Sequence, residues 1–178
     1  MVKKIVVLTC VLLLITLPAH ALFQLENDDT RRPGRSGLGF GQVAGGTAIN
    51  ISWGIGEYTN LYFVTGPGAG LGLKQRLLQE NVNMPLSLDL TAETTSLKNW
   101  HTSAYGCVVR KKIGDDVSGF LKFEAIDNNA DWSGLEGLTQ RSISSAGIDW
   151  KLWQDTALLL QISDRPDTFG TASLFILL

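Results

Sequence analysis

The sequence is poor in cysteine, histidine and proline, and the shortage of the first two excludes whole classes of structure. Only two of the 178 residues are cysteines and two are histidines. Cys10 lies in an N-terminal apolar run that we expect to be removed, which leaves Cys107 without a disulfide partner. A structural zinc site needs clustered Cys and His side chains. The sequence therefore predicts no disulfide scaffold, no metal site and no cofactor.

Long apolar runs are missing after the N-terminus. Residues 5–17 form the one apolar run, preceded by Lys3 and Lys4 and followed by Ala19-His20-Ala21, with small residues where a signal peptidase cuts. A transmembrane helix needs roughly 20 apolar residues, so a retained anchor is disfavoured. We expect a signal peptide at 1–21, cleaved after Ala21, and no transmembrane helix in the remainder.

Charge of one sign is not concentrated anywhere. The chain has 15 basic and 17 acidic side chains, a formal net charge of −2. No basic stripe marks a nucleic-acid surface, so we expect no nucleic-acid partner.

Glycine and period-two alternation are what the sequence does have. Nineteen glycines and only five prolines favour many short strands with tight turns. Residues 84–96 are typical: Leu86, Leu88, Leu90 and Ala92 share one face, and Ser87, Asp89, Thr91 and Glu93 share the other. After a polar leader at 22–36, about ten such segments fill 37–178, with eight as the alternative count, each of roughly the length that a tilted membrane strand needs.

Alternation alone does not say which face is buried, because soluble barrels alternate too. Small or charged residues on the polar face, short turns at one end and aromatics near the strand ends favour an all-β, closed, up-and-down antiparallel transmembrane barrel. The expected interfacial aromatics are Trp53, Tyr58, Trp100, Trp132, Trp150 and Trp153. The expected lumen charge network is Lys74, Asp89, Glu93, Arg110, Lys122, Glu124, Asp149 and Lys151. In that network, Asp89 and Glu93 should pair with Lys74, Arg110, Lys122 or Lys151.

The last segment alternates as well, with Ala172, Leu174, Ile176 and Leu178 on one face. In this the chain resembles small bacterial outer-membrane β-barrel proteins as a class. The resemblance implies a cell outer-membrane location, surrounding lipid and lipopolysaccharide, both termini in the periplasm, and a terminal strand that barrel-assembly machinery recognises. The chain departs from the class in ending on Leu178 rather than an aromatic residue, with Phe175 on the opposite face.

The sequence names no specific activity. A barrel of 8–10 strands has room inside for side chains or one small ligand, so we expect a narrow, plugged lumen and a structural, adhesive or loop-mediated binding role. A soluble lipocalin-like barrel that binds an apolar ligand is one alternative. A lipid-A-modifying enzyme is another, on the basis of His101 and Ser103 at the expected outer rim, but the chain is not expected to be an enzyme.

Overall fold

A computed structural model describes residues 34–43, 46–66, 68–97, 100–127, 142–153, 155–163 and 170–177. These residues form ten strands: β1 (Ser36–Val43), β2 (Gly46–Gly54), β3 (Thr59–Thr65), β4 (Ala69–Leu78), β5 (Ser87–Leu97), β6 (Trp100–Lys112), β7 (Val117–Asp127), β8 (Ser142–Trp153), β9 (Thr156–Ser163) and β10 (Gly170–Leu177). The expected signal peptide, most of the polar leader, Trp132 and the side chains of Trp100 and His101 lie outside the described part of the chain.

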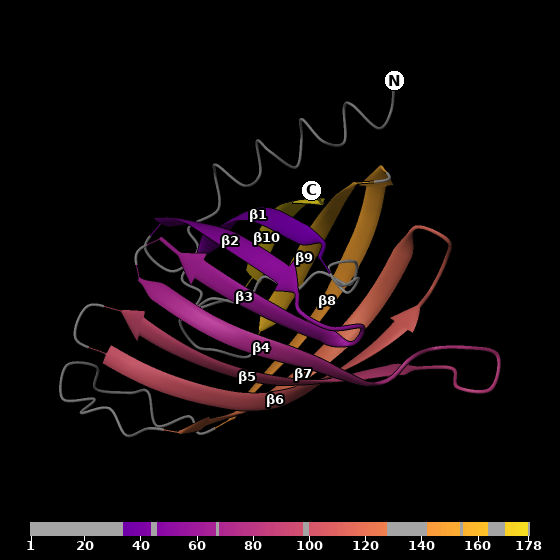
Figure 1. The fold of residues 1–178 in the computed structure, drawn as a ribbon, viewed down its shortest axis with the longest axis horizontal. Helices are drawn as coiled ribbons and strands as arrows, with labels where there is room; N and C mark the ends of the chain where they lie inside the picture. Colours follow the sequence, from indigo (N-terminus) through magenta and orange to yellow (C-terminus); the bar gives the residue numbers. More distant parts are fainter. Residues whose placement is uncertain are drawn as a thin grey trace.

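Each strand pairs antiparallel with the next one in the chain, so the all-β, up-and-down architecture is confirmed (Figure 1). In addition, β1 pairs with β10 from Gly37 opposite Leu177 to Gly41 opposite Ser173. The strand order thus returns to its starting point as a closed ring. Pairing of this kind leaves no strand edge with free backbone N–H and C=O groups.

The segment predicted as a strand at 84–96 begins three residues later, at Ser87. Residues 79–86 form the β4–β5 connection, which projects beyond the neighbouring turns in Figure 1. The Asn81 side-chain oxygen accepts from the backbone N–H groups of Asn83 and Met84 at 2.9 and 3.0 Å, so residues 81–84 form a local turn instead of strand. Turns at this end of the sheet are therefore not uniformly short.

Burial along the strands runs opposite to that of a water-soluble protein. On β7, Leu121 exposes 49% of its surface, Lys122 1% and Phe123 48%. The same alternation holds on β5, where Asp89 is fully buried and Leu90 is 45% exposed. The expected assignment of faces therefore agrees with the structure on these strands: charged residues point inward and large apolar residues point outward.

Two positions break the alternation of outward apolar residues. By period two, Leu152 on β8 falls on the face of Ile148 and Trp150, but it is 3% exposed, because the β8–β9 register shifts between Lys151 and Trp153. Leu158 on β9 falls on the face of Leu160 and Ile162, yet it is buried and lies in register with Trp150 on β8.

No helix among the described residues has the length and apolarity needed to cross a membrane.

Candidate functional site: a charged interior

Two buried ion pairs lie on the inner face of the sheet. Arg76 on β4 binds Asp89 on β5 through two bonds, from Nε to Oδ1 and from Nη2 to Oδ2 at 2.9 Å, the fork geometry that makes Arg–carboxylate pairs strong. Arg110 on β6 lies 3.5 Å from Asp149 on β8, measured from Nη1 to Oδ2. Removing either partner of such a pair would leave a buried charge without the group that binds it, which is strongly destabilising.

A second cluster joins β3, β5 and β7. Lys122 Nζ lies 2.7 Å from Glu124 Oε1 and 3.9 Å from Glu93 Oε2. The Tyr62 hydroxyl donates to the same Glu93 oxygen at 2.9 Å. Two carboxylates thus share Lys122, and the Tyr62 hydroxyl supplies a further donor to Glu93.

Large inward side chains rest on glycines of the adjacent strand. Tyr62 is directly opposite Gly72, and a Cβ at Gly72 would lie 2.1 Å from Tyr62 Cζ. Phe120 is directly opposite Gly147 in the same way, with Phe120 Cζ 2.3 Å from a Cβ at Gly147. Because Gly72 and Gly147 have no side chain, the Tyr62 and Phe120 rings can lie close to the backbone of the adjacent strand.

Apolar groups also lie in the interior. Two buried apolar clusters are present, one of Val108, Phe120, Ala157 and Leu159 and the other of Ala48, Tyr62 and Val64. The Arg110 guanidinium lies over the Phe120 ring at 5.2 Å and connects the first cluster to the ion pairs.

One end of the interior stays open as a polar vestibule of about 510 Å³. Its walls include Arg76, Arg110, Lys112, Asp149 and Lys151, next to the β6–β7 turn residues. The two ion pairs lie on its inner side. Acidic and basic side chains both line it, so it carries no field of a single sign.

The structure places all eight residues of the expected charge network on the inner face or at this vestibule. Lys74 is buried near Asp89, and Lys151 is half-buried at the vestibule. Glu93 lies 3.9 Å from Lys122, one of its expected partners. Asp89 differs from the expectation, because it binds Arg76, which the expected network does not include. Tyr62 was omitted too. Arg76 could have been found from its alternation with Lys74, whereas no charge pattern on β3 points to Tyr62.

The expected interfacial aromatics gather at one end where they are described. Trp53, Tyr58 and Trp153 are 41%, 42% and 45% exposed, and Trp150 is half-buried. They lie at or beside the β2–β3 and β8–β9 turns. This is one belt of exposed aromatics at one rim.

Ser103, offered above as a catalytic candidate, lies on the outward-facing side of β6, because its neighbour Ala104 points inward and is buried. Glu93 points inward to Tyr62 and Lys122, so the structure does not bring Ser103 and this carboxylate together. Within the described ranges, no group of three or more His, Cys, Asp or Glu side chains could hold a metal ion.

Comparison with known proteins identifies no family for this chain. No protein-family model matches the chain, and no curated protein matches it. Among solved structures, a chain described as "De novo design of transmembrane beta-barrels" is similar at 15% identity, with a TM-score of 0.38, over 83% of this chain and 97% of that chain. Because the TM-score is below 0.5, we draw no functional conclusion from this similarity.

Proposed function

We propose that the chain is an integral β-barrel protein of a bacterial outer membrane, exported by the cleavable signal at 1–21. Its lumen is narrow, lined by charges and plugged, and its role is structural, adhesive or binding through its loops. Its surroundings are outer-membrane lipid and lipopolysaccharide, and its last strand is the segment that assembly machinery recognises.

One observation carries the proposal, namely the reversed burial of the strands. In water, an outer wall of large exposed leucines, isoleucines and phenylalanines would forgo about 25 cal/mol for every Å² of apolar surface left uncovered. In a bilayer the same wall faces hydrocarbon, and the charges stay inside, where they are paired. The continuous pairing of strands supports the same conclusion, because unpaired backbone groups are not tolerated in hydrocarbon.

The filled interior supports the plugged lumen. Between the vestibule and the far end lie the Arg76–Asp89 pair, the Lys122 cluster and the two apolar clusters described above. A barrel of about this strand number has an interior wide enough for side chains or one small ligand, and not for a wide aqueous channel. We therefore propose no general porin activity.

Fractionation with heat-modifiable migration tests the proposal. The mature protein should remain in the outer-membrane fraction after a urea wash, dissolve only with detergent, and migrate differently in gels with and without boiling. Recovery in the soluble periplasmic fraction would contradict the membrane assignment and favour the soluble ligand-binding barrel. A separate measurement tests for lipid-A-modifying activity. The lipid-A acyl chains should be unchanged on overexpression, both for the wild type and for Ser103→Ala.

A further inference from the structure

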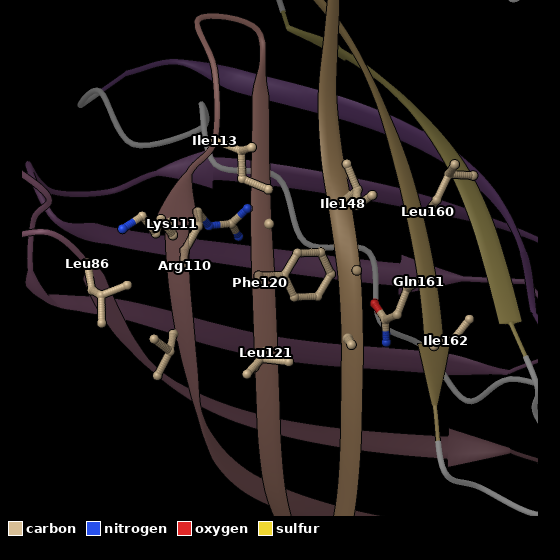
Figure 2. Close-up of a pocket in the computed structure, with 14 residues that line it drawn as sticks. Leu86, Arg110, Lys111, Ile113, Phe120, Leu121, Ile148, Leu160, Gln161 and Ile162 are labelled. Carbon is tan, nitrogen blue, oxygen red and sulfur yellow. The ribbon is translucent and has the colours of Figure 1, made fainter.

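An open apolar groove crosses the outer face of β6, β7, β8 and β9 (Figure 2). It has a volume of about 770 Å³. Leu121, Ile148, Leu160 and Ile162 form its outward-facing walls, and Ile113 closes it at the rim. Outward-facing side chains of these strands form most of the groove, and the buried residues Arg110, Phe120 and Gln161 also border it.

The strand register explains why the wall is hollowed at this place. One row across the strands reads Lys111, Gly119, Ile148 and Leu160, and the next row reads Val109, Leu121, Ala146 and Ile162. Gly119 and Ala146 are diagonal neighbours in these rows, and both lack a large side chain. The Ile113 side chain lies over Gly119, with Cδ1 3.0 Å from the position of an added Cβ, and closes that end. The trough therefore runs over Ala146, between Leu121 and Ile162, in the way that a flexible hydrocarbon chain could lie.

The charges at the groove are of one sign. Its lining includes Lys111 and Arg110 but no carboxylate. Arg110 is bound to Asp149 on the inner side, whereas Lys111 is exposed on the outer face. The two aspartates of the adjacent β6–β7 turn, Asp115 and Asp116, line the vestibule and not the groove. The groove thus offers a cation at its rim end and only apolar surface toward the middle of the sheet.

We propose that this groove binds one anionic glycerophospholipid, with an acyl chain in the trough and the phosphate at Lys111. The inference rests on the proposed membrane location. Lys111 lies at the rim where β1 begins and β10 ends, since Gly37 is opposite Leu177. In the proposed orientation that rim is periplasmic, where a glycerophospholipid rather than lipopolysaccharide meets the wall.

Native mass spectrometry of the full mature protein tests the proposal. The protein is folded into vesicles of equimolar phosphatidylglycerol and phosphatidylcholine with identical acyl chains, released in mild detergent, and scored for retained lipid. The wild type should keep one phosphatidylglycerol. Ala146→Phe fills the trough and should lower retention at least tenfold, while Ala125→Phe, an exposed position on β7 outside the groove, should leave it unchanged.

The charge is tested with adjacent lysines that lie on opposite faces. Lys111→Gln should reduce the preference for phosphatidylglycerol over phosphatidylcholine about fivefold, the effect of one basic residue at a membrane surface. Lys112→Gln removes the same charge at the vestibule and should not change the preference. Equal retention by Ala146→Phe and wild type, or equal lipid preference in the two lysine variants, would overturn the proposal.

Two other outcomes separate this inference from the proposed function. A heat-modifiable, vesicle-inserted protein that retains no lipid overturns the lipid site and leaves the membrane barrel intact. A dimer that Ala146→Phe dissociates also overturns it, and assigns the groove to a second copy of the chain. A protein that never inserts into the vesicles overturns the membrane barrel and the lipid site together.

Discussion

The glycine beneath Tyr62 gives the sharpest stability prediction. A methyl group at Gly72 would lie 2.1 Å from Tyr62 Cζ and 2.3 Å from its hydroxyl oxygen, so Gly72→Ala must displace the ring. Overpacking of this kind costs about 1–3 kcal/mol. Moving the ring also breaks its 2.9 Å bond to Glu93. A hydrogen bond to a charged group contributes about 1.5–3 kcal/mol. We expect a total loss of about 2.5–6 kcal/mol.

Gly70→Ala is the matched control. Gly70 lies on the same strand and the same face, but a Cβ there would come no closer than 3.4 Å to Thr94 and Thr95 atoms. We expect its free energy of unfolding to stay within about 1 kcal/mol of the wild type. The assay is reversible urea unfolding of the protein folded into phosphatidylcholine vesicles, followed by tryptophan fluorescence.

Substitutions of Tyr62, alone and combined with Gly72→Ala, then separate the cost of overpacking from the cost of the lost hydrogen bond. Tyr62→Phe keeps the ring and removes the hydroxyl, and it should cost only the hydrogen-bond part. Tyr62→Ala removes the ring, so adding Gly72→Ala to it should cost little more. If Gly72→Ala is as stable as Gly70→Ala, or if its cost is unchanged in the Tyr62→Ala background, the ring does not rest on Gly72 and the reasoning is refuted.

Three further predictions concern the wall, the ion pair and the plug. Leu90→Arg should destabilise by about 2–4 kcal/mol in the same urea assay, while Leu90→Phe should be nearly neutral; equal effects would argue against a lipid-facing Leu90. Arg76→Met removes the partner that binds both Asp89 carboxylate oxygens and should cost at most about 3–5 kcal/mol, since the nearby Lys74 and Arg110 charges compensate part of the loss. Adding Asp89→Leu should recover most of that loss, and a double variant less stable than Arg76→Met would contradict the pair. In planar bilayers the wild type should pass no stepwise current, whereas Phe120→Ala with Leu159→Ala should open one; wild-type channels would refute the plug.

The strands and their faces could be predicted from sequence because each strand has a different environment on its two sides. Asp89 lies between two leucines, and successive residues of a strand point to opposite faces. Period-two alternation therefore predicts that Asp89 lies on one face and the two leucines on the other. It does not specify which face is buried. Three-dimensional burial resolves that question, because Lys122 is 1% exposed and its neighbour Leu121 is 49% exposed.

Features that depend on register could not be predicted. The shift between Lys151 and Trp153 turns Leu152 inward, and no residue there signals a bulge. The contact of Tyr62 with Gly72 needs the β3–β4 register, which alternation along one strand does not contain. The Arg76–Asp89 pair was missed for a weaker reason, since Arg76 shares the face of Lys74 and could have been included.

Site-directed fluorescence along β5 tests the central claim, the reversed burial of the strands in a lipid bilayer, most directly. A polarity-sensitive fluorophore is attached to single cysteines at Leu90, Thr91, Ala92 and Thr95 in a Cys107→Ala background, with the protein in vesicles that carry a lipid-bound quencher. We predict strong quenching at Leu90 and Ala92 and weak quenching at Thr91 and Thr95, which are 4% and 6% exposed. Quenching that is uniform along the strand, or strongest at the two threonines, would contradict the account.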